Sequence, residues 1–142
     1  MTTNKKPAEA KALIDNEGWL YLDVRSVEEF QAGHPAGAWN IPVMHKSPMG
    51  MTPNATFAAD VARAFKKDTK LIVGCASGVR SLRACDLLAE AGFEYLANME
   101  GGFMGARDDY GRVTPGWASS GFPVEAKAPD ERTYAQLKAK PQ

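Results

Sequence analysis

The segment Cys75-Ala76-Ser77-Gly78-Val79-Arg80 places a thiol, a glycine and a guanidinium within six residues. The apolar run from Lys70 to Gly74 precedes it and predicts a short buried strand, and a helical pattern follows from Ser81 to Ala91. Cys75 is therefore expected on a strand-to-helix loop, where backbone N–H groups and the positive end of the helix dipole converge. Such surroundings favour the thiolate, which is the nucleophilic form of cysteine.

Each residue of this loop has an expected role in holding a small anionic group. We expect Cys75 to be the catalytic nucleophile, and the loop residues that follow it to bind the substrate, chiefly through backbone N–H groups: Ala76, Ser77, Gly78, Val79 and Arg80. Gly78 lets the chain turn inward without a Cβ, and Arg80 offers a fork of donors to an oxyanion. The loop is one residue shorter than the loop that surrounds phosphate in cysteine phosphatases, so it suits a smaller reacting atom. An inert core cysteine is the alternative interpretation.

Composition and charge narrow the class of protein. The chain has 142 residues, 44% of them hydrophobic and 24% charged, which predicts one soluble globular core. Its 17 basic and 17 acidic residues cancel, so nucleic acid is not expected as a partner. No apolar run is long enough to span a membrane or to form a signal peptide, and we expect a cytoplasmic location. Cys75 and Cys85 do not make a disulfide framework.

Hydrophobic periodicity predicts alternating strands and helices. Besides the strand and helix around Cys75, the pattern favours helices over 8–16, 26–31 and 54–67 and strands over 19–24, 38–43 and 95–99. We expect a surface loop over 44–53 and turns beyond Asp108. This alternation predicts an α/β fold with a parallel sheet covered by helices on both faces and a ligand site at the carboxyl ends of the strands.

The chain is divided into one domain, residues 8–126, and a C-terminal tail, residues 127–142. The tail is expected to be partly helical near 130–138, and this stretch is expected either to pack outside the core or to fray.

Several other residues could take part in the chemistry, but a structural role is favoured for each. His34 lies in a Gly/Pro turn and is expected to hydrogen-bond within its own loop; with His45 and the two cysteines it gives no zinc spacing. Arg25 is expected to pair with Glu28 or Glu29.

Three further residues have two interpretations each. Asp23 is expected to accept local backbone hydrogen bonds, with support of the reactive loop as the alternative. Cys85 shares a helical stripe with Leu82, Leu88 and Ala89, which favours the core over a resolving thiol. Trp117 either shields the reactive sulfur or anchors the closing segment.

Four ordered motifs resemble the single-domain rhodanese family of sulfurtransferases, particularly its short plant and bacterial thiosulfate sulfurtransferases. The motifs are Asp23-Val24-Arg25 with Glu28-Glu29-Phe30, the run from Gly33 to Pro42, the loop from Cys75 to Arg80, and Gly101-Gly102 with Trp117 and the run from Gly121 to Glu125. The sequence departs from many members at Pro35, where they carry a branched apolar residue, and in a longer stretch from Phe103 to Gly116.

The resemblance implies a small α/β domain with a parallel sheet of about five strands. It also implies that Cys75 takes sulfane sulfur from thiosulfate or a similar donor, holds it as a persulfide and passes it to cyanide or a thiol, for which thioredoxin and glutathione are candidates. No cofactor or metal is expected. Two alternatives stay open: a persulfide carrier or sensor that acts on a protein partner, and a phosphatase or arsenate reductase.

Overall fold

A computed structural model describes residues 2–139 and contains a five-stranded parallel sheet. The strands lie in the order β1, β8, β7, β2, β4, so β7, which leads into Cys75, is the central strand. The bounds of these strands are Thr2–Lys5 for β1, Leu20–Asp23 for β2, Trp39–Asn40 for β4, Lys70–Gly74 for β7 and Tyr95–Met99 for β8.

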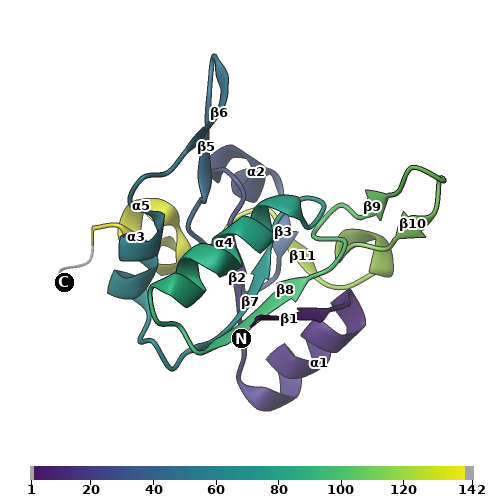
Figure 1. Cartoon of the computed structure of the whole chain (residues 1–142), viewed down its shortest axis with the longest axis horizontal. Coiled ribbons are helices and arrows are strands. Elements are labelled where there is room, and N and C mark those ends of the chain that lie inside the picture. The colour runs from purple at the N-terminus through teal and green to yellow at the C-terminus, as the bar shows by residue number, and fades with distance from the viewer. Residues whose placement is uncertain (1, 140–142) are drawn as a thin grey trace.

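Helices cover both faces of the sheet, as the sequence predicts (Figure 1). Side chains alternate along the strands: Leu22 and Val73 enter one core, and Tyr21 and Ile72 enter the other. The helices α3, α4 and α5 contribute to the first core, and α1 and α2 contribute to the second. Their bounds are Pro7–Glu17 for α1, Val27–Ala32 for α2, Phe57–Ala64 for α3, Val79–Glu90 for α4 and Tyr134–Leu137 for α5.

The strand register brings the functional segments to one edge of the sheet. Asp23 pairs with Gly74 on one side and with Asn40 on the other, so β2, β4 and β7 end at the same level. The backbone N–H of Val24 donates to the carbonyl of Gly74 at 2.9 Å, which continues this pairing to the last residue before Cys75. The loop therefore begins at the carboxyl edge, where ligands bind in sheets of this type.

Two strands differ from the sequence prediction. The edge strand β1, which pairs in parallel with β8, was not predicted, because Thr2 to Lys5 carries no hydrophobic alternation. The strand predicted over 38–43 forms only at Trp39–Asn40. Beyond Asn40 the N–H groups of Ile41 and Val43 still donate to the carbonyls of Asp23 and Val24, but two residues of this segment advance against one of β2, so the regular ladder ends.

The segment predicted as a surface loop over 44–53 is a β-hairpin instead. Its strands, β5 (Met44–Ser47) and β6 (Gly50–Pro53), pair antiparallel and extend away from the body of the protein (Figure 1). Gly50 has a φ of 113°, a conformation that favours glycine at the tip. Most of β6 is exposed, so the sequence has no core-facing alternation that would reveal a strand.

Smaller elements complete the fold. The two-residue strands β3 (His34–Pro35) and β11 (Val124–Glu125) pair antiparallel, as do β9 (Ala106–Arg107) and β10 (Val113–Thr114). The β9–β10 hairpin projects from the side of the molecule opposite α3 and α5 (Figure 1). Two short 3-10 helices, η1 (Ala118–Ser120) and η2 (Asp130–Arg132), lie in the closing segment.

The helix after the reactive loop begins earlier and faces the core differently from the prediction. It starts at Val79 rather than Ser81, and its buried residues are Ser81, Ala84, Cys85 and Leu88. Leu82 and Ala89, which were predicted on the apolar stripe, are exposed. The buried side follows the i, i+3, i+4, i+7 spacing from Ser81, a polar residue that the sequence reading did not place in the core.

The C-terminal helix packs into the first core, so the prediction that it lies outside is wrong. Leu137 is completely buried, and Tyr134 donates a hydrogen bond from its hydroxyl to Asp60 of α3 at 2.7 Å. The sequence does not indicate this packing for two reasons. The helix has only four residues, too few for a clear hydrophobic periodicity, and its partner Asp60 lies 74 positions from Tyr134. Residues 140–142 of the predicted tail lie outside the described residues.

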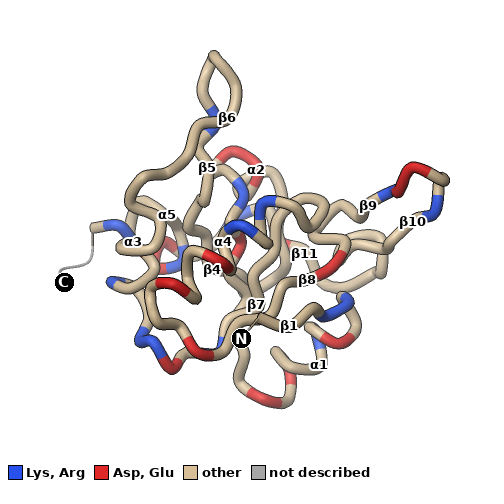
Figure 2. Tube along the Cα trace, viewed as in Figure 1, with Lys and Arg blue, Asp and Glu red and all other residues tan. Residues whose placement is uncertain are grey.

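Positions of Lys and Arg and positions of Asp and Glu are both distributed along the described part of the trace (Figure 2). Among residues 2–139, no helix has the length and apolarity needed to cross a membrane.

Candidate active site

Cys75 lies on the strand-to-helix loop that the sequence predicts, with its sulfur held by the loop's own backbone. The N–H of Gly78 donates to Sγ at 3.0 Å, and the thiol donates to Oγ of Ser81 at 3.4 Å. Gly78 takes a φ of 106° at the N-terminal boundary of α4, which turns its N–H back toward the sulfur. The side chain of Cys75 is 1% exposed, so the sulfur lies at the base of the loop.

A glycine-rich segment after β8 supports this loop from behind. The N–H groups of Phe103 and Met104 donate to the carbonyls of Cys75 and Ala76 at 2.7 and 2.8 Å. Gly102 makes this approach possible, because a Cβ at this position would collide with the carbonyl oxygen of Cys75. The pair Gly101-Gly102, which the sequence offers only as part of a motif, therefore belongs to the support of the reactive loop.

Arg80 is fixed by an ion pair with Glu29 of α2. Two nitrogens of the guanidinium donate to the two carboxylate oxygens of Glu29, at 2.7 and 2.9 Å. The hydrogen bond from Arg80 lowers the pKa of Glu29 to about 2 against the opposing effect of burial, with further hydrogen bonds from Ser26. This bidentate pair ties the first turn of α4 to α2. It was not predicted from the sequence, because its partners lie 51 positions apart.

Arg25 pairs with Asp23 and not with Glu28 or Glu29, so the predicted partner is wrong. Its guanidinium donates to both carboxylate oxygens of Asp23 and to the carbonyl of Gly33, with distances between 2.6 and 3.1 Å. The ring of Phe103 lies 4.4 Å from the guanidinium carbon. Glu29 is already engaged by Arg80, which leaves the buried Asp23 to neutralise Arg25.

Asp23 accepts a local backbone hydrogen bond as expected, from the N–H of Arg25 at 2.9 Å. The Asp23 and Arg25 pair holds the turn after β2 next to the segment that supports the reactive loop.

A chain of polar side chains extends from the sulfur through the buried Ser81 and Asn98 to the exposed Asn4 at the edge of the sheet. Ser81 donates from Oγ to Oδ1 of Asn98 at 2.5 Å, and Nδ2 of Asn98 donates to Oδ1 of Asn4 at 3.2 Å. These residues come from α4, β8 and β1, so their proximity depends on the sheet order. The only signals of this chain in the sequence are two polar residues: Asn98 within a predicted strand and Ser81 at the start of a predicted helix.

The remaining candidates have structural contacts. The imidazole of His34 is fully buried, stacks on Phe30 and bonds to the carbonyl of that residue at 2.6 Å and to Glu125 at 3.0 Å. Trp117 donates from its indole to the carbonyl of Pro123 at 2.7 Å, which anchors the closing segment. Burial raises the pKa of the Cys85 thiol to about 12, in agreement with its expected place in the core.

The site thus combines the thiol of Cys75, the backbone N–H of Gly78 directed at it, the N-terminus of α4 and the guanidinium of Arg80 held in one orientation. This combination is suited to a cysteine nucleophile that acquires or transfers a small anionic group. Among residues 2–139 no group of three or more His, Cys, Asp or Glu side chains gathers as metal ligands would.

Comparison with known proteins assigns a family to this arrangement. A model of the rhodanese-like domain matches residues 6–109. Thiosulfate sulfurtransferase 16, chloroplastic, from Arabidopsis thaliana is 38% identical over 109 residues, which are 77% of this chain and 82% of the relative. Protein HIGH ARSENIC CONTENT 1, mitochondrial, from the same plant is 37% identical over 123 residues, covering 87% of this chain and 66% of the relative.

The fold is also shared with a solved structure. The crystal structure of Rv0390 from M. tuberculosis superimposes with a TM-score of 0.72 at 26% identity, and the match covers 89% of this chain and 98% of that one.

Proposed function

Because the chain belongs to the rhodanese-like domain family, we propose that this sulfurtransferase takes sulfur from thiosulfate and carries it as a persulfide on Cys75. The observation that supports this proposal most directly is the N–H of Gly78 at 3.0 Å from the sulfur of Cys75. A donor in this position favours the thiolate of Cys75, which is the nucleophile of the first step.

The proposed reaction has two displacement steps. The thiolate of Cys75 attacks the outer sulfur of thiosulfate, a sulfur–sulfur bond forms, and sulfite leaves with the electron pair of the broken bond. The outer sulfur of the resulting persulfide is then attacked by cyanide or a thiolate, and the electron pair of the breaking bond returns to Cys75. No protein group has to remove a proton during either displacement once the nucleophile is ionised.

Substrate binding is assigned to the loop residues 76–80. The N–H of Gly78 lies 3.0 Å from the sulfur of Cys75. The other backbone N–H groups of residues 76–80 are proposed to bind the incoming substrate, and Arg80 is proposed to offer the sulfonate of thiosulfate the donors that Glu29 does not occupy. The support for this assignment is the ion pair, since it keeps a cation beside the loop in one orientation.

Thiols such as glutathione or the thioredoxin dithiol are proposed as acceptors, together with cyanide. The location is proposed to be cytoplasmic, in contrast to the chloroplastic and mitochondrial relatives.

Turnover of thiosulfate with cyanide tests the proposal. We expect the Cys75→Ala variant to lose sulfite and thiocyanate production, whereas Cys85→Ala, the matched control at the other cysteine, retains both. Full activity of Cys75→Ala would refute the assignment of the nucleophile.

A second candidate function, arsenate reduction, is favoured by the name of one relative, which refers to arsenic content. It shares the requirement for a cysteine nucleophile in an anion-binding loop. Arsenate consumption by the wild type with a thiol reductant, lost in Cys75→Ala and unaccompanied by thiocyanate formation from thiosulfate, would reverse the order of the two candidates.

A further inference from the structure

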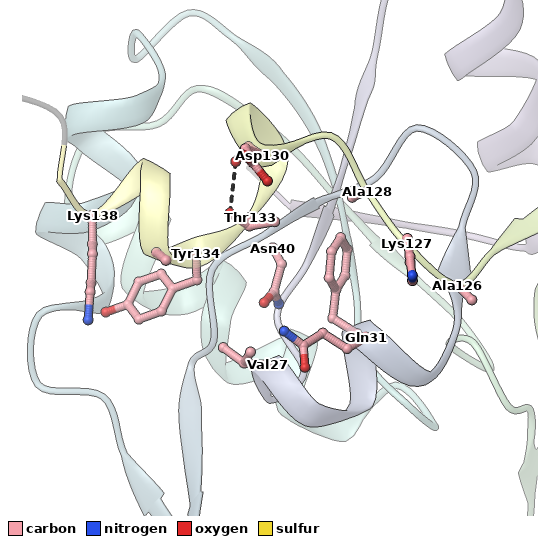
Figure 3. Close-up of a pocket in the computed structure, with 12 residues that line it drawn as sticks. Val27, Gln31, Asn40, Ala126, Lys127, Ala128, Asp130, Thr133, Tyr134 and Lys138 are labelled. Carbon is pink, nitrogen blue, oxygen red and sulfur yellow. Dashed lines mark hydrogen bonds between the residues drawn. The ribbon is translucent and has the colours of Figure 1, made fainter.

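A second cavity lies away from the reactive loop, between α2, β4 and the C-terminal segment. Its volume is about 630 Å³, within the range of small-molecule sites, and none of residues 75–80 lines it. Apolar lining comes from Val27 and Phe30 of α2 and from alanines of the C-terminal segment. Polar side chains from all three elements enter the same cavity, with Asn40 between those of α2 and those of α5 (Figure 3).

Asn40 has a buried acceptor without a partner. Its Nδ2 donates to the carbonyls of Asp23 and Arg25, each at 3.0 Å. Because both carbonyls can only accept, the orientation of the amide is fixed and Oδ1 faces the other way. This oxygen has no hydrogen-bond partner among the described residues, and Asn40 is 1% exposed. Leaving such an acceptor unpaired costs about 1–3 kcal/mol, so a donor that reaches it gains affinity.

One lining residue can open the way to this oxygen. Gln31 is exposed on α2, and its side-chain amide lies beside that of Asn40 in the view of Figure 3. Because Oδ1 has almost no surface open to solvent, a ligand reaches it only if a side chain of the lining moves aside, and Gln31 is an exposed, long side chain of that lining. The group that enters must carry an N–H or O–H, because Oδ1 can only accept.

The charged residues that line the cavity favour a ligand that carries a negative charge in addition to the donor for Asn40. Lys127 and Lys138 contribute two cations and Asp130 one anion. Lys127 makes no hydrogen bond or ion pair with the described residues, and Nζ of Lys138 lies 5.2 Å from the centre of the Tyr134 ring. A carboxylate would therefore find an available ammonium group at the rim of the cavity.

We propose that this cavity binds a small organic carboxylate that carries an N–H donor, the chemistry of an N-acyl amino acid or a short peptide. The N–H pairs with Oδ1 of Asn40, the carboxylate pairs with Lys127, and the apolar part packs on Val27 and Phe30. The inference is independent of sulfur transfer and assigns a second site to the domain.

Titration of the ¹⁵N-labelled protein with three probes tests this proposal. The probes are N-acetylalanine, which has both groups, acetate, which has only the charge, and N-methylacetamide, which has only the N–H. We expect saturable shifts of the Asn40 side-chain amide signals with N-acetylalanine, and binding roughly two- to ten-fold tighter than that of acetate, the range of one net hydrogen bond.

Variants of two lysines test the carboxylate contact. Lys127→Ala is expected to weaken N-acetylalanine binding about two- to five-fold, and Lys70→Ala, an exposed lysine at the far end of β7, is expected to leave it unchanged. Absence of a saturable shift at Asn40 would overturn the proposal and leave the oxygen to water. Equal affinity for acetate and N-acetylalanine, or an equal response of the two lysine variants, would also overturn it.

Discussion

At the scale of single residues, the ion pair with Glu29 orients the guanidinium of Arg80 before the substrate binds. The bidentate contact with Glu29 fixes the plane of the guanidinium, so little side-chain entropy is left to lose when an oxyanion binds. Lysine would keep the charge but could not reproduce two parallel hydrogen bonds to one carboxylate.

Replacement of Arg80 by lysine is therefore expected to lower kcat/KM for thiosulfate by roughly ten- to a hundred-fold. The matched control is Arg83→Lys, one turn further along α4, and it should remain close to wild type. Steady-state sulfite production measures both. Equal activity of the two variants would contradict the assigned role of Arg80.

The Glu29 carboxylate makes stability depend on pH in a defined direction. Its pKa is lowered from 4.5 to about 2 in the folded protein, chiefly by the hydrogen bond from Arg80. The stabilisation is therefore present above pH 4.5 and is lost as the pH falls toward 2. Glu29 is partly exposed, so solvent screening limits this contribution to about 1 kcal/mol.

Glu29→Gln is expected to lower the free energy of unfolding by about that amount at neutral pH. Urea unfolding at a series of pH values should show the difference from wild type shrinking between pH 4.5 and 2, the interval set by the pKa shift. Glu28→Gln, on the exposed neighbouring position, serves as the control. A difference that stays constant over this interval would argue against the ion pair as its source.

The chemistry of individual residues could be predicted only where it is local in sequence. Cys75, Gly78 and Arg80 lie within six residues of the sequence, and their types and spacing suffice to indicate an anion site. Glu29 and Asn98 belong to the same site through contacts that span 51 and 17 positions, and no periodicity of their own segments points to those contacts.

At the scale of elements, the loop between β7 and α4 depends on the backbone conformation of Gly78. A positive φ of 106° is unfavourable for any residue with a Cβ, although a Cβ there would meet its nearest atom, the N of Gly101, only at 3.5 Å. Strain of the backbone is thus the main consequence of substitution, and it moves the N–H that bonds to Cys75.

Gly78→Ala is expected to destabilise the protein by about 1–2 kcal/mol and to lower kcat/KM roughly ten-fold or more. Gly111→Ala is the matched control, since Gly111 also has a positive φ, of 79°, and has open space around it in the β9–β10 hairpin. Thermal unfolding and thiosulfate turnover of both variants provide the comparison. A comparable loss of turnover in both would indicate a global rather than a local effect.

The elements around the site were predictable to different degrees. The neighbouring strands β7 and β8 coincide with the predicted ranges, because short, mostly apolar runs between turn residues are typical of buried parallel strands. The edge strand β1 and the hairpin at 44–53 lack this signal, since they are largely exposed.

At the scale of the whole molecule, the C-terminal segment is part of the structural core. Leu137 enters the core that also contains Cys75 and Cys85. Oε1 of Glu125 lies 3.0 Å from Nε2 of His34 and 2.7 Å from Nη1 of Arg132, so this carboxylate connects the closing segment to β3. The closing segment therefore stabilises the fold on which the reactive loop is built.

Leu137→Ala is expected to reduce the free energy of unfolding by about 2–5 kcal/mol, the usual cost of emptying a buried leucine site. Gln136→Ala, on the exposed side of the same short helix, should change stability by less than about 0.5 kcal/mol. Chemical denaturation of the two variants and the wild type measures these differences in the free energy of unfolding. Equal stability would mean that α5 does not contribute to the core in solution.

The central claim, that Cys75 accepts sulfane sulfur, is tested most directly by intact mass spectrometry after treatment with thiosulfate. We predict that the wild type and Cys85→Ala each gain the mass of one sulfur atom, removable by cyanide, and that Cys75→Ala gains none. An unmodified wild-type protein, or sulfur added to Cys75→Ala, would contradict the account.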